Sequence, residues 1–406
     1  MAKLSVRDLE VRGQRILVRV DFNVPLDAEG KITDDSRIRA ALPTLDYLLE
    51  RGARVIVCSH LGRPKGRDPS MSLRPVVQRL SDLILRPVAF VDDCTGEKVE
   101  KTISIMQNGD CLLLENLRFY EEEEKNDPGF AKKLASYADI YINDAFGTAH
   151  RAHASTEGVT HHVRQSAAGF LMQKELKYLG EELSDPGRPF VAILGGAKVS
   201  DKIKVIESLL DKADMLLIGG AMAYTFLKSQ GIPTGASLVE EDRLDISKRM
   251  MELAMSKEKR ILLPLDHVAA KRVETDKLDK KGRKIVEFQG AHATDCPSID
   301  DGWCGVDIGP FTIKAYQMAI AKAKTVLWNG PMGIFENKEF SKGTFEVAAA
   351  VANSGSKSIV GGGDSVKAIH ASGLAEKITF LSTGGGASLE FLEGKTLPGV
   401  AALTDK

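Results

Sequence analysis

Two short apolar runs near the C-terminal end each lead into three glycines, in Ser358-Ile359-Val360-Gly361-Gly362-Gly363-Asp364-Ser365 and in Thr379-Phe380-Leu381-Ser382-Thr383-Gly384-Gly385-Gly386-Ala387-Ser388. This pattern predicts a buried strand, a bare glycine loop and the start of a helix. Such a loop binds phosphate, because no side chain blocks the anion and the helix N–H groups and dipole favour it. Two such loops predict a phosphoryl group held from two sides. Asp364, the one carboxylate of the first loop, can hold a magnesium ion beside it.

Outward from these loops, apolar runs of strand length alternate with amphipathic stretches of helical length along the chain. The apolar runs are 16–20, 55–58, 88–91, 111–114 and 140–142 in the first half, and 191–194, 215–218, 261–265, 326–328, 358–360 and 379–381 in the second. Near-continuous apolar strands that alternate with helices are typical of parallel sheets covered on both faces. Because 406 residues exceed one ordinary core, the sequence predicts an α/β protein with two doubly wound parallel-sheet (Rossmann-like) domains.

A helix over 171–183 is predicted to join the two domains, since Ser184-Asp185-Pro186-Gly187 stops it. The expected division is a first domain at 1–170, a connecting helix and hinge at 171–187, a second domain at 188–390 and a tail at 391–406. A helical connector can transmit a hinge motion between the domains that it joins.

The composition disfavours several classes of protein. The net charge of −1 gives no overall field for nucleic acid or an acidic membrane, and no apolar stretch reaches the roughly 18 residues that span a bilayer. The N-terminus has no apolar signal core, and the five cysteines, without a C-x-x-C pair, indicate a reducing compartment. We therefore expect a cytoplasmic protein without a membrane or nucleic-acid partner, and a monomer because no coiled-coil repeat occurs.

The loops after the strands of the first half are rich in arginine. In an open parallel sheet, ligands bind beyond the carboxyl ends of the strands, so these loops are the expected site. These loops contain Asp21, Asn23, His60, Leu61, Gly62, Arg63, Arg118 and Arg151, and Arg37 follows the first of them. Arginines bind anionic groups and Asp or Asn binds hydroxyls, which fits a small, doubly anionic ligand with hydroxyl groups. Any single loop can instead be a helix cap paired with an arginine, but four arginines at one edge favour a site.

The loops after the strands of the second half are rich in glycine instead. They are Gly195-Gly196-Ala197-Lys198-Val199-Ser200-Asp201-Lys202, Gly219-Gly220-Ala221, Asn329-Gly330-Pro331 with Glu336 beyond it, and the two triplets. Lys198 and Lys202 stand at i and i+4 of a predicted helix opening, where both ammonium groups share one face and suit a polyphosphate. Neither G-x-x-x-x-G-K-[ST] nor G-x-G-x-x-G occurs, which excludes an ordinary P-loop and disfavours a dinucleotide site.

Three features receive no function from the sequence. We expect the run Glu121–Lys125 to be a solvated face, and the polar segment 266–297 to be an irregular, exposed excursion. The histidines His150, His153, His161 and His162 cluster in the sequence. The first two can share a helix face and hold a metal, but no third ligand has supporting spacing, so we expect ordinary polar roles.

Together, these stretches resemble the phosphoglycerate kinase family. The matching segments are 19–25, 60–64, 115–119, 143–151, 195–202, 328–331, 361–365 and 384–390. Each alone is suggestive, but the full set in family order is specific. The resemblance implies the transfer of a phosphoryl group between 1,3-bisphosphoglycerate and ADP, to give 3-phosphoglycerate and ATP, with Mg²⁺.

The resemblance also assigns the sites. It implies that the first domain holds phosphoglycerate through the arginine-rich loops, and that the tail packs back on that domain. It implies a nucleotide site in the second domain made of Lys198, Lys202, Gly219, Gly220, Gly309, Asn329, Pro331, Glu336, Gly362, Gly363, Asp364 and Ser365. Asp364 would carry the magnesium ion.

The implied reaction needs no covalent intermediate and no general base, since the attacking carboxylate is already ionised at neutral pH. Catalysis then reduces to positioning and to stabilising charge on the migrating group. We assign the charge stabilisation to Arg37 from the first domain, and from the second to Lys198 with the N–H groups of Gly363 and Gly386. Because the reagents bind to different domains and water must be excluded, we expect hinge closure.

Two other functions stay open. A non-catalytic binder of small anions explains the arginines and the hinge, but not the lysine pair, the glycine triplets and Asp364; binding of ATP distinguishes it. A nicotinamide-dependent dehydrogenase is disfavoured by the missing glycine fingerprint, and titration with NADH distinguishes it.

Overall fold

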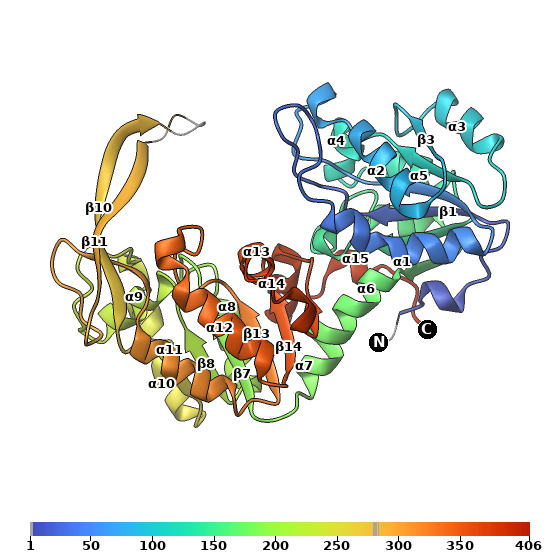
Figure 1. Cartoon of the computed structure of the whole chain (residues 1–406). Coiled ribbons are helices and arrows are strands. Elements are labelled where there is room, and N and C mark those ends of the chain that lie inside the picture. Colours follow the sequence, from blue (N-terminus) through green and yellow to red (C-terminus); the bar gives the residue numbers. More distant parts are fainter. Residues whose placement is uncertain (1–2, 279–281, 283) are drawn as a thin grey trace. The chain divides into compact units, whose positions relative to one another are not determined.

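The computed structural model describes residues 3–278, 282 and 284–406. The chain divides into two compact units, the first comprising Met1–Lys177 with Lys395–Lys406 and the second comprising Tyr178–Gly394. Each unit has its own six-stranded parallel sheet with helices around it, so the predicted α/β class is confirmed (Figure 1). In the part of the chain that is described, no helix is both long and apolar enough to cross a membrane.

The sheet of the first unit has the order β3-β4-β2-β1-β5-β6, with every neighbouring pair parallel. Its strands are β1 (Arg15–Val20), β2 (Arg54–Cys58), β3 (Val88–Val91), β4 (Cys111–Leu114), β5 (Ile140–Asp144) and β6 (Ser166–Ala168). The central strands are buried along almost their whole length, because helices cover both faces of a parallel sheet. This burial explains why the strands appear in the sequence as continuous apolar runs.

Helices of the first unit surround this sheet. They are α1 (Ser36–Glu50), α2 (Arg74–Ile84), α3 (Glu97–Ser104), α4 (Glu121–Glu124) and α5 (Pro128–Ala135). All of these except α4 bury apolar side chains. Leu45 of α1 and Leu80 of α2 lie in the same core cluster as Ile16 of β1, and all three are fully buried. Full burial of such a side chain contributes about 1.5–3 kcal/mol. The packing of these connecting helices against the sheet therefore fixes the positions of the loops that follow β1, β2, β4 and β5.

The expectation of a solvated face over Glu121–Lys125 is wrong at one position. Glu121, Glu122 and Glu124 are exposed, but the carboxylate of Glu123 is fully buried. In a single helical turn, one of four successive side chains must face inward, and a buried charge persists only where partners satisfy it. The partners of Glu123 come from a distant segment and are described below.

The C-terminal residues belong to the first unit. Helix α15 (Pro398–Ala401) places the carbonyl of Gly399 3.1 Å from Asn143 Nδ2, at the end of β5. Lys3 Nζ pairs with Asp405 at 2.8 Å, and Thr404 exchanges hydrogen bonds with Ser166 of β6. Gly399 thus contacts the carboxyl end of β5, which precedes one of the arginine-rich loops, whereas Thr404 contacts the first residue of β6.

The parallel sheet of the second unit has the order β15-β14-β13-β7-β8-β9. Its strands are β7 (Phe190–Leu194), β8 (Met215–Ile218), β9 (Arg260–Leu262), β13 (Thr325–Asn329), β14 (Lys357–Gly361) and β15 (Phe380–Leu381). Its helices are α8 (Ile203–Lys212), α9 (Met222–Ser229), α10 (Leu244–Ser256), α11 (Pro310–Ile320), α12 (Lys342–Asn353), α13 (Gly363–Ala371) and α14 (Gly386–Leu392). Trp328, fully buried in β13, lies at the centre of this core.

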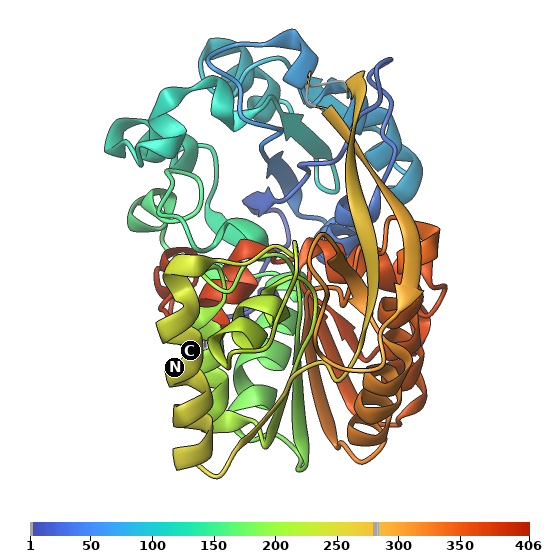
Figure 2. The same ribbon diagram turned by 90° about the vertical axis from the view of Figure 1, so that its left-hand side faces the viewer.

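The second unit also has an antiparallel sheet that the sequence did not predict. It consists of β10 (His267–Leu278), β11 (Lys284–Ala293) and β12 (Cys304–Ile308), in the order β11-β10-β12. The prediction of irregular structure over 266–297 is therefore wrong, whereas the predicted exposure holds for most of both strands. Only the base of the β10–β11 hairpin is buried, and the outer part is largely exposed, so no regular alternation of apolar and polar residues marks it as strand. The hairpin is the long ribbon visible in Figures 1 and 2.

A helical run joins the two units, as predicted for 171–183. It consists of α6 (Phe170–Glu175), a π-helical segment at Leu176–Glu181 and α7 (Glu182–Ser184). The division between the units falls inside the π-helical segment, after Lys177. A π-helical turn loosens the regular hydrogen-bond ladder and frequently occurs at functional sites.

Candidate active site

The loops after β1 and β2 are held together by the polar residues predicted there. Arg37, near the start of α1, donates from Nη1 to Asp21 Oδ2 at 2.5 Å. Asn23 Oδ1 accepts a hydrogen bond from the backbone N–H of Gly62 at 2.8 Å. The side chain of Arg37 is 37% exposed, so its guanidinium retains access to a ligand. The structure thus brings Asp21, Asn23, Arg37 and Gly62 together at one sheet edge.

Asn116, after β4, fixes the neighbouring loop through both ends of its amide. Its Oδ1 accepts from the N–H groups of Leu61 and Arg118, both at 3.1 Å, and its Nδ2 donates to the carbonyl of Leu61 at 2.8 Å. Arg118 in turn donates to the carbonyl of Gly62 at 2.7 Å and pairs with Glu124 at 3.1 Å. The predicted site residues Leu61, Gly62 and Arg118 are therefore positioned by one buried amide that the sequence did not single out.

Positive charge concentrates around His60. Burial, together with the guanidinium groups of Arg19 and Arg118, holds the pKa of His60 well below its usual range. Burial, together with Arg19 and Arg151, also lowers the pKa of Arg118. The charge of Arg37 contributes to the lowered pKa of His60 as well. Hydrogen bonds place Arg37 against Asp21 and Arg118 against Gly62, and Arg151 lies in the loop after β5. Arg63 lies exposed in the loop after β2, next to Gly62.

Two of the histidines predicted to have polar roles make polar contacts with neighbouring side chains. Arg151 Nε lies 3.2 Å from His150 Nε2, and His161 pairs with Glu157 at 2.5 Å. Among the described residues, no group of three or more His, Cys, Asp or Glu side chains is arranged to hold a metal ion.

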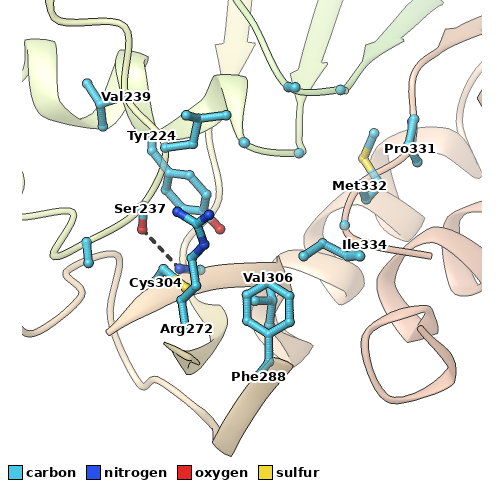
Figure 3. A pocket seen from close by; sticks show the side chains of 18 of the residues that line it. Tyr224, Ser237, Val239, Arg272, Phe288, Cys304, Val306, Pro331, Met332 and Ile334 are labelled. Carbon is cyan, nitrogen blue, oxygen red and sulfur yellow. Dashed lines mark hydrogen bonds between the residues drawn. The ribbon is translucent and has the colours of Figure 1, made fainter. Parts of the chain in front are cut away.

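The second unit contains a cavity of about 690 Å³ at the ends of its strands (Figure 3). Its walls are formed by Gly196, Ala197, Gly220, Ala221, Tyr224, Ala236, Ser237, Leu238, Val239, Arg272, Phe288, Cys304, Gly305, Val306, Pro331, Met332, Gly333, Ile334, Glu336 and Asp364. The walls are mainly apolar, with a few polar groups, which is the usual make-up of a site for a flat organic group. The predicted residues Gly220, Pro331, Glu336 and Asp364 all lie in this wall.

Three glycine loops meet at the floor of the cavity because their backbones touch. The N–H of Gly196 donates to the carbonyl of Pro331 at 3.1 Å, and the N–H of Gly220 donates to that of Met332 at 2.9 Å. A Cβ on Gly195 would lie 2.0 Å from the Pro331 oxygen, and one on Gly219 would lie 2.4 Å from Met332 Sδ. The loops after β7, β8 and β13 thus require glycine for close approach. Gly219 serves packing, while Gly220 faces the cavity.

Lys198 and Lys202 do not share a helix face, contrary to the prediction. Helix α8 begins only at Ile203, so both lysines precede it, Lys202 in the turn directly before the helix and Lys198 in the loop before that turn. Lys202 is buried and donates to the Asn329 side chain, whereas Lys198 is exposed and follows the cavity residues Gly196 and Ala197. Burial lowers the pKa of Lys202 to about 8, against the raising effect of Asp201 and Asp364.

Both glycine triplets lead into helices, as predicted. Gly362, with φ +89°, caps α13 after β14, and Gly385, with φ +53°, caps α14. Ser365 Oγ accepts from the N–H of Gly330 at 2.5 Å, which ties the first triplet to the loop after β13. Around Gly363 there is open space, since nothing lies within 4 Å of a Cβ placed there. Gly386 is the first residue of α14.

Gly309 does not line the cavity, although the resemblance implied it. It caps α11 and packs on Asp266, whose carboxylate would lie 2.4 Å from a Cβ at this position. Gly305, four residues earlier in β12, does line the cavity, and a Cβ there would lie 1.9 Å from the Tyr224 hydroxyl oxygen. The sequence offers both glycines in one short stretch, and the strand that places Gly305 was not predicted.

The hairpin supplies two further wall residues that the sequence analysis missed. Figure 3 shows Arg272 of β10 and Phe288 of β11 beside Tyr224 and Val306. Neither residue carries a distinctive sequence signal, because Arg272 follows another cation, Lys271, and Phe288 is a single aromatic residue in a mainly polar segment.

The two edges, arginines on one parallel sheet and glycines on the other, define the class of protein as a two-domain α/β kinase. The family model for phosphoglycerate kinase matches residues 6–395. The phosphoglycerate kinases of Koribacter versatilis and Moorella thermoacetica are both 56% identical to this chain, over the full length of each. The solved phosphoglycerate kinases of Coxiella burnetii (40% identity, TM-score 0.86) and Pyrococcus horikoshii OT3 (33%, 0.82) each match 98% of both chains. The chain belongs to the phosphoglycerate kinase family.

Proposed function

We propose that this protein transfers a phosphoryl group reversibly between 1,3-bisphosphoglycerate and ADP, giving 3-phosphoglycerate and ATP. The observation that carries the proposal is the pairing of an arginine cluster and a glycine-floored cavity at the strand ends of two sheets, in a chain that matches its family from end to end. The arginine cluster would bind the anionic groups of phosphoglycerate, and the glycine-floored cavity would bind the nucleotide.

The first unit is the proposed phosphoglycerate site. Arg37, Arg63, Arg118 and Arg151 supply donors for the carboxylate and phosphate of the ligand, since a guanidinium fork binds such groups in a bidentate manner. Asp21 and Asn23 are polar neighbours suited to the hydroxyl group. His60, Leu61 and Gly62 complete the site from the loop after β2.

The second unit is the proposed nucleotide site. The apolar wall around Tyr224, Phe288 and Val306 suits the adenine ring, and the Glu336 carboxylate suits the ribose hydroxyls. The phosphates would then meet Lys202 and the N–H groups of the loop from Gly362 to Ser365 at the start of α13.

Mg²⁺ enters this proposal as part of the nucleotide substrate. Asp364 lines the cavity and its side chain is 62% exposed, so one carboxylate is available there. That fits Mg²⁺, which proteins commonly hold through one or two carboxylates while phosphates and water supply the other ligands. Bound with the nucleotide, the ion would neutralise phosphate charge.

The chemistry requires positioning more than acid–base catalysis. The carboxylate of 3-phosphoglycerate is ionised at neutral pH and attacks the γ-phosphate in line, so no group need remove a proton. The transition state spreads charge over the equatorial oxygens, which Arg37, Lys198 and the N–H groups of Gly363 and Gly386 would stabilise. Because the ligands bind to different units, transfer also requires a motion that brings them together, and the π-helical segment is the proposed hinge.

A coupled assay with ATP, Mg²⁺ and 3-phosphoglycerate tests the proposed function. We expect turnover that depends on all three components. We also propose that the protein is cytoplasmic and monomeric. Binding of ATP without turnover would instead support a non-catalytic binder and refute the proposal.

Replacing Arg63 by alanine is expected to raise KM for 3-phosphoglycerate about fivefold, because one exposed charge-assisted contact is lost. Isothermal titration calorimetry should show unchanged affinity for ATP. Lys65→Ala, which removes an exposed cation two residues away, is the control and should leave both affinities unchanged. A loss of ATP affinity in Arg63→Ala would reverse the assignment of the two ligands to the two units.

Replacing Lys198 by alanine is expected to slow phosphoryl transfer more than tenfold with little change in phosphoglycerate affinity, because its charge acts on the migrating group. Stopped-flow single turnovers measure this step. Lys204→Ala, an exposed lysine on α8, should turn over normally. Unaltered turnover in Lys198→Ala would remove this lysine from the transition state.

A further inference from the structure

The buried carboxylate of Glu123 heads a chain of hydrogen bonds that leads to His60. Its two oxygens accept from the N–H and the hydroxyl of Ser155, at 2.9 and 2.6 Å. Ser155 Oγ accepts in turn from Arg19 Nε at 2.9 Å. Arg19 Nη2 then lies 3.1 Å from His60 Nδ1. Every member of this chain is less than 9% exposed.

The orientation of Arg19 is fixed on all sides. Nε is held by Ser155, Nη2 lies against His60, and Nη1 donates to the carbonyl of Val20. A guanidinium that is 1% exposed is stable only with a compensating negative charge nearby. The carboxylate of Glu123 provides that charge through the Ser155 hydroxyl. Burial raises the pKa of Glu123, and the guanidinium of Arg19 and the hydrogen bonds from Ser155 oppose this rise.

This arrangement settles which nitrogen of His60 carries a proton. Arginine has donors and no acceptor, so Nδ1 of His60 must accept from Arg19 and cannot be protonated. A neutral imidazole then carries its proton on Nε2. The alternative partner for an Nδ1 proton, Asp21 Oδ1, lies 3.9 Å away.

We propose that Glu123 is a positioning residue of the phosphoglycerate site, which holds Arg19 through Ser155 and thereby keeps His60 as the Nε2–H tautomer. The inference rests on the proposed function, because it assigns His60 as a donor to phosphoglycerate. It goes beyond that function by giving a role to a carboxylate that touches no ligand.

A purely structural role for Glu123 is the competing explanation. The backbone of Glu123 already anchors the segment around Ser155, since its carbonyl accepts from the N–H of Ala154 at 2.9 Å. His153 Nδ1 also lies 4.0 Å from Glu123 Oε1. A test must therefore read the state of His60 and the binding of substrate, not stability alone.

The test compares the full-length wild type with Glu123→Gln, which keeps shape but removes the charge. In this variant the charge of Arg19 is no longer compensated, so we expect its guanidinium to move away from His60. Nδ1 of His60 can then carry a proton and donate it to Asp21 in a hydrogen bond. Nitrogen-15 NMR of His60 without substrate should show Nε2–H in the wild type and a population of Nδ1–H in the variant. KM for 3-phosphoglycerate should rise about tenfold, with KM for ATP within twofold.

Two further variants complete the design. Glu122→Gln, an exposed neighbour on the same turn, should match the wild type in both readouts. Ser155→Ala removes only the hydroxyl bridge and should reproduce the tautomer change, which keeps the proposal testable if Glu123→Gln fails to fold. Lowered thermal stability with an unchanged tautomer and an unchanged KM for 3-phosphoglycerate would overturn the positioning role. A wild type that turns over no phosphoglycerate would overturn the proposed function, and with it this role for the substrate, whatever the tautomer shows.

Discussion

Replacing Arg37 by alanine is expected to lower kcat by about 100- to 1000-fold, the usual effect of removing one donor that stabilises developing charge. Arg37 is poised for this role because Asp21 orients its guanidinium through Nη1, while 37% of the side chain stays exposed. The remaining N–H groups of the fork can then meet an anionic oxygen. KM for ATP should stay within twofold, because the nucleotide binds to the other unit in our proposal. Steady-state kinetics with each substrate varied in turn measures both constants.

Two control variants make this result specific. Arg39→Ala removes an exposed arginine of the same helix, paired with Asp35 at 3.0 Å, and should retain kcat. Arg37→Lys keeps the charge but loses the planar fork, so we expect its kcat to lie between those of the wild type and Arg37→Ala. A rise in KM for 3-phosphoglycerate with an unchanged kcat would show that Arg37 binds the ground state and the transition state equally.

The sequence predicted those features whose signal is local. An apolar run such as Cys111–Leu114 indicates a strand buried on both faces, and the residues after such runs lie at one edge of the sheet. This reasoning located Asp21, Arg37 and Arg118 and the glycine loops. It also found the helical connection between the units, since Pro186 and Gly187 mark its end.

The sequence could not reveal groups whose role depends on distant partners. Arg19 lies inside β1, so a search of the loops after the strands passes over it, and its hydrogen-bond partner Ser155 is 136 residues away. Glu123 looks like any member of an exposed glutamate run until Ser155 is placed beside it. Burial of a charge is a property of the tertiary structure, and no local pattern of residues encodes it.

The sequence did not predict the β10–β11 hairpin for a different reason. Sequence periodicity reports burial, and most of β10 and β11 is exposed on both faces, so only pairing between the strands defines them. The wall residues Arg272, Phe288 and Gly305 depend on this sheet and were missed with it. Gly309 came from the family resemblance, whereas Gly305 lies in β12, a strand that the sequence did not predict.

Replacing Gly220 by alanine is expected to disable the second unit. Gly220 has φ +66°, and its new Cβ would lie 2.5 Å from the nitrogen and 2.6 Å from the oxygen of Gly196. Both atoms are backbone, so no side chain can rotate away and the loops after β7 and β8 must separate. We expect a loss of about 3 kcal/mol in the free energy of unfolding, from overpacking and left-handed strain, and a rise of about 100-fold in KM for ATP. Urea denaturation and steady-state kinetics measure the two effects.

Gly231→Ala separates the steric effect from the backbone strain. Gly231 also has a left-handed backbone, with φ +77°, but nothing lies within 4 Å of its Cβ position. This variant should lose about 1 kcal/mol from strain alone and keep its affinity for ATP. If Gly220→Ala lost no more stability than Gly231→Ala and bound ATP normally, the contact between the two glycine loops would not be what shapes the nucleotide cavity. The three glycine loops form both the floor of the cavity and the centre of the sheet edge. We therefore expect Gly220→Ala, unlike Gly231→Ala, to lose both stability and affinity for ATP.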